Sequence, residues 1–278
     1  MDPDKLADRP DSSSGDAAAI LRWWLEAGVQ FAIDETPHDH FAQAGRPTPA
    51  PPSPAVPVGA TVETSALPGR RAAAEADRSP AEISARELAA SASDLATLQA
   101  RLGAFEGCGL KRTATQLVFA DGAPGSRVMF VGEAPGADED RIGRPFVGRA
   151  GQLLDRMLKS IGLDRDHVYI ANVVPWRPPG NRTPTLEETQ ACLPFIKRQI
   201  ELAAPEILVC LGGSAAQTLL GVREGITRAR GVWTPYPCGD GRTLRALAMF
   251  HPAFLLRQPG QKRQAWRDLR ALAKELGA

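Results

Sequence analysis

The chain has 278 residues with nearly balanced charge, 33 Lys and Arg against 32 Asp and Glu, and is long enough for one large domain or for a domain with a tail. The charge is unevenly spread, because residues 1–92 carry a net charge of −6 and residues 93–278 a net charge of +7. A basic core with an acidic arm is typical of a protein that binds a polyanion, although an ordinary solvated surface gives the same totals. With no signal peptide and no apolar run of membrane-spanning length, we expect a cytoplasmic protein without membrane contact.

The first 78 residues predict an arm outside the globular core. Residues 16–29 have the apolar spacing of a short amphipathic helix, which could dock on the core or on a partner protein. Residues 46–79 are rich in Pro and Ala and predict a disordered linker, because this composition cannot bury enough surface to order itself. Ser79 and Pro80 provide a helix cap and a first-turn proline, so we expect the globular domain to span residues 79–278.

From Ser79 onward, predicted helices and strands alternate. Helical periodicity covers 81–104, about 149–162, 186–203 after a Thr185 cap, 214–220 and about 261–276. Apolar runs predict strands at 127–133, 168–174, 207–211 and 244–250. The alternation predicts an α/β fold, a three-layer α/β/α sandwich with a four-stranded parallel sheet. Ligands of such sheets bind beyond the carboxyl ends of the strands.

Several polar or aromatic side chains lie at these predicted strand ends. A glycine loop, 132–136, contains Glu133 and leads through an acidic segment, 138–140, to Phe146. Asn172 lies in the second strand, and His251 follows the fourth. An aromatic face, an amide and an imidazole are suited to binding a nucleobase by stacking and edge hydrogen bonds. Considered alone, a histidine at a strand end is more often structural, and an acidic loop is often merely solvated.

Several segments together resemble a family 4 uracil-DNA glycosylase. They are Gly132-Glu133-Ala134-Pro135-Gly136, Glu139-Asp140, Arg144-Pro145-Phe146-Val147-Gly148-Arg149-Ala150-Gly151, Asn172-Val173-Val174, Arg177-Pro178-Pro179-Gly180-Asn181-Arg182 and His251-Pro252-Ala253-Phe254-Leu255-Leu256-Arg257. The resemblance covers roughly residues 105–275. It implies monofunctional removal of uracil from DNA after the base has been flipped out of the helix.

The resemblance implies a role for each matching pocket residue. Phe146 would stack on the flipped uracil, and Asn172 would hydrogen-bond its pyrimidine edge. His251 would donate to uracil O2 as negative charge builds on the leaving base, while Glu133 would hold the attacking water or stabilise the sugar cation. Further substrate-binding positions are Gly132, Ala134 and Glu139.

The last matching segment suggests how the protein would contact DNA. Phe254 or Leu255 would enter the gap left by the flipped base, although both could instead pack on the core. The following basic helix would contact phosphates, although it could also be a solvated helix face. The basic candidates are Arg257, Lys262, Arg263, Arg267 and Arg270.

Family 4 enzymes usually hold an iron–sulfur cluster on four cysteines, and here the resemblance is incomplete. Cys108 and Cys192 match two of those positions, while Phe105 and Trp176 stand at the other two. Because a cubic cluster needs about four thiolates, we expect no cofactor and no metal, with the two rings filling the space. A cluster held by the two cysteines and borrowed ligands is the open alternative.

The leading hypothesis is therefore a monomeric hydrolase that acts on uracil-containing DNA and leaves an abasic site. The contrasting hypothesis is a non-catalytic module that binds uracil-containing DNA and recruits a protein partner through the N-terminal arm.

Overall fold

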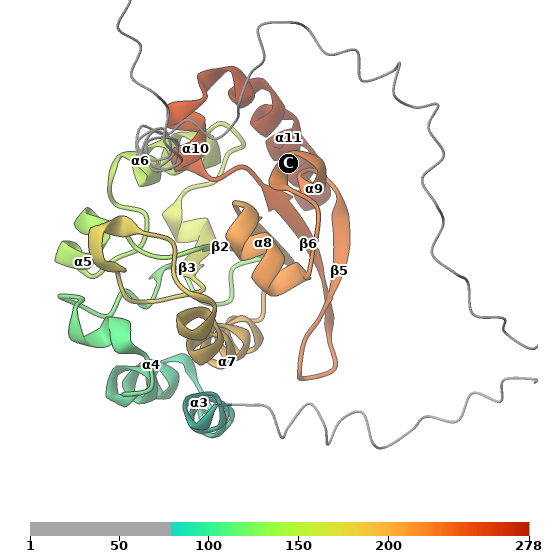
Figure 1. Cartoon of the computed structure of the whole chain (residues 1–278). Coiled ribbons are helices and arrows are strands. Elements are labelled where there is room, and N and C mark those ends of the chain that lie inside the picture. The colour runs from blue at the N-terminus through green and yellow to red at the C-terminus, as the bar shows by residue number, and fades with distance from the viewer. Residues whose placement is uncertain (1–78, 278) are drawn as a thin grey trace, which may run out of the picture. The chain divides into compact units, whose positions relative to one another are not determined.

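A six-stranded sheet organises residues 79–277, the part of the chain that this computed structural model describes (Figure 1). Its order is β1-β3-β2-β4-β6-β5. The strands are β1 (Asp121–Gly122), β2 (Val128–Gly132), β3 (Val168–Asn172), β4 (Ile207–Leu211), β5 (Trp233–Pro237) and β6 (Thr243–Met249). The predicted α/β sandwich and its four parallel strands, β3, β2, β4 and β6, are confirmed. Two antiparallel edge strands, β1 and β5, were not predicted.

The sequence of each strand explains its place in the sheet. All five residues of β2, of β3 and of β4 are buried, as expected for parallel strands covered on both faces. The β5 strand contains Pro235 and Pro237 and buries only Tyr236. Proline lacks the N–H that a central strand must donate, so β5 can lie only at an edge.

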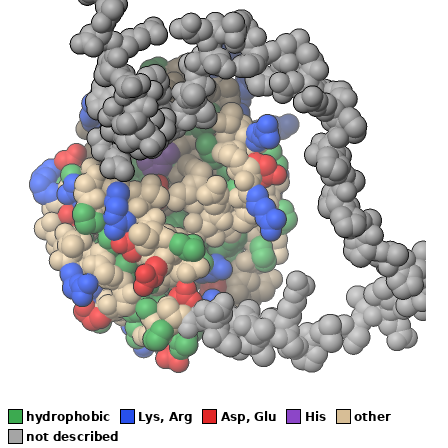
Figure 2. Space-filling model, in the orientation of Figure 1, with side chains coloured by type: hydrophobic (Ala, Val, Ile, Leu, Met, Phe, Trp, Pro, Cys, Tyr) green, Lys and Arg blue, Asp and Glu red, His purple; other side chains and the backbone are tan. Residues whose placement is uncertain are grey.

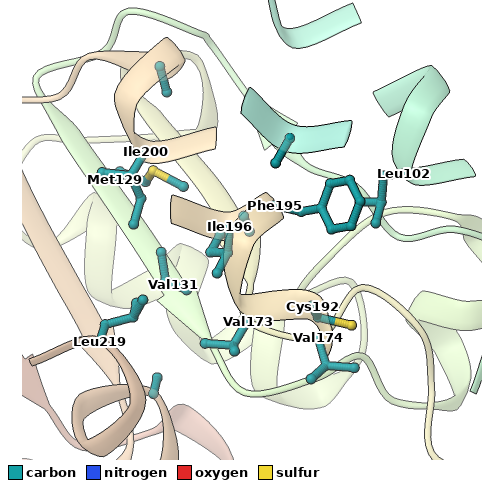
Figure 3. Close-up of a cluster of buried hydrophobic side chains, with 14 of the residues drawn as sticks. Leu102, Met129, Val131, Val173, Val174, Cys192, Phe195, Ile196, Ile200 and Leu219 are labelled. Atoms are coloured by element: carbon teal, nitrogen blue, oxygen red, sulfur yellow. The ribbon is translucent and has the colours of Figure 1, made fainter. Parts of the chain in front are cut away.

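Helices cover both faces of the sheet, with α3, α4 and α7 on one side and α6, α10 and α11 on the other (Figure 1). Residues alternate along β2, so that Met129 and Val131 face the first group and Val128 and Phe130 the second. Figure 3 shows part of the first core, where α7 packs on the sheet. The helices are α3 (Pro80–Ala90), α4 (Leu95–Ala104), α5 (Ala137–Ile142), α6 (Arg149–Lys159), α7 (Leu186–Ala203), α8 (Gly213–Leu220), α9 (Ile226–Ala229), α10 (Pro252–Arg257) and α11 (Lys262–Leu276).

Helix boundaries confirm some predictions and correct one. Ser79 caps α3 by accepting the Glu82 N–H at 3.3 Å, and Thr185 caps α7 in a reciprocal pair with Glu188. The single helix expected at 81–104 is wrong, because the chain breaks after Ala90 and restarts at Asp94. The Asp94 side chain accepts the Thr97 N–H at 2.7 Å, which satisfies a free donor of the new helix.

The predicted amphipathic helix at 16–29 and the linker before Ser79 lie outside the described residues. Within residues 79–277, no helix has both the length and the apolar character that a membrane crossing requires.

Candidate active site

A cavity of about 610 Å³ lies where the four parallel strands end. The residues that follow β2, β4 and β6, together with Asn172 at the end of β3, contribute to its wall. On the face of the molecule that Figure 2 shows, most of the basic side chains lie toward the edge. The predicted site residues that line the cavity are Glu133, Ala134, Glu139, Phe146, Asn172, His251, Phe254 and Arg257.

The aromatic ring, the amide and the imidazole meet in this cavity. The rings of Phe146 and His251 have centroids 5.4 Å apart and are tilted by 32°. A Cβ atom at Gly132 would lie 2.5 Å from Asn172 Oδ1 and 2.6 Å from Phe146 Cζ. Only glycine at position 132 therefore lets the amide and the ring approach each other this closely.

Two buried oxygen atoms in the cavity, Asn172 Oδ1 and Glu133 Oε1, have no hydrogen-bond partner within residues 79–277. Asn172 is 4% exposed, so water is largely excluded from its amide. Leaving a buried acceptor unpaired costs about 1–3 kcal/mol, and folded proteins avoid this except where a site requires it. The cavity thus offers an acceptor to a ligand that carries an N–H group.

His251 is held as a neutral imidazole with one defined tautomer. Its Nδ1 accepts the Ala253 N–H at 3.1 Å, as the cap of α10. Because Nδ1 acts as an acceptor, the ring proton must lie on Nε2. Burial and the nearby charge of Arg257 lower the pKa of His251 to about 4. At neutral pH the ring is therefore a hydrogen-bond donor without positive charge.

Glu133 follows β2 and enters the cavity from its partly buried wall. Burial raises the pKa of its carboxyl above the ordinary value of 4.5, while hydrogen bonds with Ser214 and Thr183 act in the opposite direction. Sequence reasoning missed both hydroxyl residues. Ser214 was visible only as the expected start of a helix, and Thr183 only as the residue after a matching segment.

The acidic segment 138–140 is not simply solvated, contrary to the alternative that the sequence left open. Glu139 is 8% exposed and accepts three backbone N–H groups, from Gly136 at 3.1 Å and from Val147 and Gly148 at 2.9 Å each. Asp140 is 4% exposed and binds the Thr115 N–H at 2.8 Å. Glu139 therefore joins the two loops that form one wall of the cavity, and its oxygens are directed at backbone.

The proposed DNA-contacting residues differ in how far they are exposed. Leu255 is 1% exposed and packs in the core between the sheet and α6, so the interpretation of Leu255 as a wedge is wrong. Phe254 lines the cavity and is only partly buried, with its ring 5.0 Å from that of Phe250. The remaining candidates are exposed, namely Arg257, Lys262, Arg263, Arg267 and Arg270.

The cysteine positions lie together but do not offer four thiolates. Cys108 and Cys192 are both buried, and Figure 3 shows Cys192 beside Val174. A hydrogen bond with the Cys108 thiol raises the pKa of Cys192, and burial raises it further. Phe105 and Trp176 are buried in the same core, at 3% and 2% exposure. Among residues 79–277, no three metal-binding side chains gather in one place. This donor set does not fit a four-cysteine cluster.

Comparison with known proteins gives a consistent result. Residues 119–270, more than half of the chain, match the model of the family described as the uracil DNA glycosylase superfamily. The chain is 45% identical over 151 residues to the type-4 uracil-DNA glycosylase of Thermotoga maritima, covering 54% of this chain and 77% of that protein. It is 39% identical over 180 residues to the type-4 enzyme of Archaeoglobus fulgidus, and the match covers 61% and 87% of the two chains. The corresponding enzyme of Pyrobaculum aerophilum is also 39% identical, over 184 residues, 63% of this chain and 91% of that protein. With its strand-end cavity and these matches, the chain belongs to the uracil-DNA glycosylase superfamily.

Proposed function

We propose that this enzyme removes uracil from DNA by hydrolysing the N-glycosidic bond, which releases the free base and leaves an abasic site. The observation that carries the proposal is the meeting of Phe146, Asn172 and a neutral His251 in one cavity at the strand ends. A base inside a duplex cannot be reached by these groups, so the uracil nucleotide must first be extruded, at a cost of a few kcal/mol.

The ring of Phe146 and the amide of Asn172 recognise the flipped base. Phe146 offers a flat apolar face for stacking, which does not by itself distinguish one base from another. The unpaired Asn172 Oδ1 is an acceptor for the N3–H of uracil. Cytosine has a lone pair at that position, so the same oxygen would repel it. The amide therefore distinguishes uracil from cytosine, and the ring holds the flipped base in the pocket by stacking.

His251 and Glu133 act on the bond that breaks. As the C–N bond lengthens, negative charge builds on the uracil ring, and the His251 Nε2–H donates to O2. A neutral donor suits this task, because it stabilises the charge without transferring its proton to the base. The carboxylate of Glu133 orients the attacking water or offsets the positive charge on the sugar. Fixed groups of this kind contribute about 10²–10³ in rate each.

Outside the cavity, Phe254 and the basic residues near it bind the DNA. Phe254 occupies the gap that the extruded nucleotide leaves in the base stack. Arg257, Lys262 and Arg263 contact phosphates, which fixes the register of the protein without reading sequence. The protein acts as a monomer on uracil-containing DNA, and its N-terminal arm contacts a protein partner.

A single-uracil oligonucleotide with an end label tests this function by its alkali-dependent cleavage. The wild-type protein is expected to release uracil, and His251→Ala to lower the rate about 10²–10³-fold through loss of the donor. Asn172→Asp is expected to lose or alter the base preference, because a carboxylate lacks the N–H donor that the amide offers to the uracil carbonyl next to N3. The matched control is His167→Ala, which removes an exposed histidine bonded to Asp164.

Binding of the same oligonucleotide without cleavage by the wild-type protein would contradict the proposal and favour the non-catalytic binding module. Equal rates for His251→Ala and His167→Ala would remove His251 from the mechanism.

We also propose that the enzyme works without an iron–sulfur cluster. Phe105 and Trp176 stand at two of the four ligand positions that the family resemblance implies, and neither ring can ligate iron. The ring of Phe105 packs against Phe195 of α7, with centroids 5.1 Å apart. Apolar packing, rather than metal ligation, then joins the end of α4, the loop after β3 and α7.

A further inference from the structure

The backbone of Phe146, the proposed stacking residue, lies in the left-handed region with φ of 55°. Residues other than glycine, asparagine and aspartate seldom adopt this conformation, and they keep it only where the surrounding structure imposes it. The direction of the Phe146 ring depends on this backbone, because the side chain leaves the chain at the strained residue. Whatever holds the backbone therefore also holds the stacking surface.

Arg165 contacts the backbone on either side of that strained residue. Its Nη1 donates to the carbonyl oxygen of Pro145 at 3.2 Å, and its Nη2 donates to the carbonyl oxygen of Phe146. Arg165 lies in the short turn that precedes β3, outside the residues that line the cavity. Among the contacts that the structure describes, its direct link to the stacking residue runs through the two backbone carbonyls that flank Phe146 Cα.

Arg165 is itself fixed by two carboxylates. Its Nε donates to Asp155 Oδ1 of α6 at 2.8 Å, and its Nη1 pairs with Asp121 of the edge strand β1. These bonds use different N–H groups of the planar guanidinium, so its orientation toward the two carbonyls is set by its neighbours. A lysine ammonium could keep the charge but could not reproduce this fixed fork.

The backbone that follows Phe146 is also held in place by hydrogen bonds. The N–H groups of Val147 and Gly148 donate to Glu139. A Cβ atom at Gly151, in the first turn of α6, would lie 1.6 Å from the Phe146 carbonyl oxygen, so the helix also limits movement there. Of these constraints, only Arg165 binds the Phe146 carbonyl oxygen through a side chain.

We infer that Arg165 is a positioning residue for base recognition, whose guanidinium keeps the Phe146 ring in the orientation that stacks on the flipped base. The inference rests on the proposed function, because it assigns Phe146 its stacking role. Removal of Arg165 lets the strained backbone relax, and the ring then loses its fixed place in the cavity wall.

The inference is tested by inhibition with free uracil and by steady-state kinetics on the uracil oligonucleotide. Arg165→Ala and Arg165→Lys are each expected to raise the inhibition constant of uracil about tenfold, the order of one lost stacking contact. The decisive measurement is a double-mutant cycle with Phe146→Ala. If Arg165 acts through the ring, its replacement has no further effect on uracil inhibition once the ring is absent.

Arg144→Ala is the matched control, since Arg144 pairs with the same Asp121 at 2.8 Å but donates to neither carbonyl. It is expected to keep the wild-type inhibition constant, and thermal unfolding of every variant separates loss of fold from loss of recognition. Arg165 variants that match Arg144→Ala, or that weaken inhibition equally with and without the Phe146 ring, would overturn the inference alone. A folded wild-type protein that neither releases nor binds uracil would overturn the proposed function with it.

Discussion

Glu133 carries a carboxyl group into a cavity wall that disfavours its charge. Burial raises the pKa of this carboxyl, and one of its oxygens has no hydrogen-bond partner among the residues that the structure describes. The folded state therefore binds a proton at Glu133 more tightly than the unfolded state does. The stability that this group contributes is complete below pH 4.5 and is lost as pH rises through the folded pKa.

This residue gives a prediction in which stability and activity move in opposite directions. Glu133→Gln is expected to raise the free energy of unfolding above that of the wild type at pH 7.5, and the gain should shrink as pH falls to about 4. Uracil release should fall about 10²–10³-fold. Urea denaturation at both pH values, with the oligonucleotide assay, measures the two effects.

Glu139→Gln is the control, because it removes a carboxylate that accepts three backbone N–H groups and should therefore lower stability at pH 7.5. A stability gain of Glu133→Gln that is the same at both pH values would contradict a titrating Glu133. Because the pKa of His251 is about 4, no loss of activity from that ring is expected between pH 5 and 8.

At the scale of elements, the sequence predicts the helices and strands that have a clear apolar pattern. It does not predict features that depend on how those elements pack together. The buried parallel strands follow from uninterrupted apolar runs, and Glu133, Asn172 and His251 follow from their positions at strand ends. The break between α3 and α4 was missed because the apolar spacing continues across it, although the Asp94 cap was present as a signal. The β5 edge strand was missed because its prolines argue against a strand unless its edge position is known.

The same limit applies to single side chains within elements. Phe254 and Leu255 are adjacent and both apolar, so the sequence alone does not predict which of the two side chains points from α10 into the core of the domain. Packing of α10 against α6 buries Leu255 and leaves Phe254 at the cavity. Likewise, the sequence of the acidic segment 138–140 does not predict that Glu139 and Asp140 point inward, because this depends on which backbone N–H groups need an acceptor.

The packing of α7 against the end of α4 leads to a prediction about iron. The protein, purified without oxygen, is expected to contain iron far below one cluster per chain and to lack visible absorbance, because Phe105 and Trp176 cannot supply the missing ligands. Cys108→Ser with Cys192→Ser should leave the iron content unchanged. Stoichiometric iron with a brown chromophore that the double variant loses would contradict the prediction.

At the scale of the whole molecule, residues 79–278 are proposed to be the complete catalytic domain. A chain that begins at Ser79 is expected to have the same midpoint of thermal unfolding and the same kcat/KM on a short uracil oligonucleotide as the full chain. A chain that begins at Leu95 is the control, because it loses the α3 residues Ala85 and Ala89, which are buried against the rest of the domain, and it should unfold at a lower temperature. Lower kcat/KM for the Ser79 chain would place part of the catalytic machinery in residues 1–78.

The cavity draws Glu133 and His251 from positions more than one hundred residues apart, and they meet only because β4 pairs with β2 on one side and with β6 on the other. A ribosome that has released the chain only as far as α8 has therefore made Phe146 and Asn172, the residues proposed to stack on the base and to discriminate it, but has not yet made His251 or the β6 strand that precedes it. Formation of the reactive centre belongs to the last pairing of the sheet, and contacts of such long sequence separation form slowly. A nascent or incompletely folded chain is accordingly expected to release no uracil, if the proposed roles of Glu133 and His251 hold.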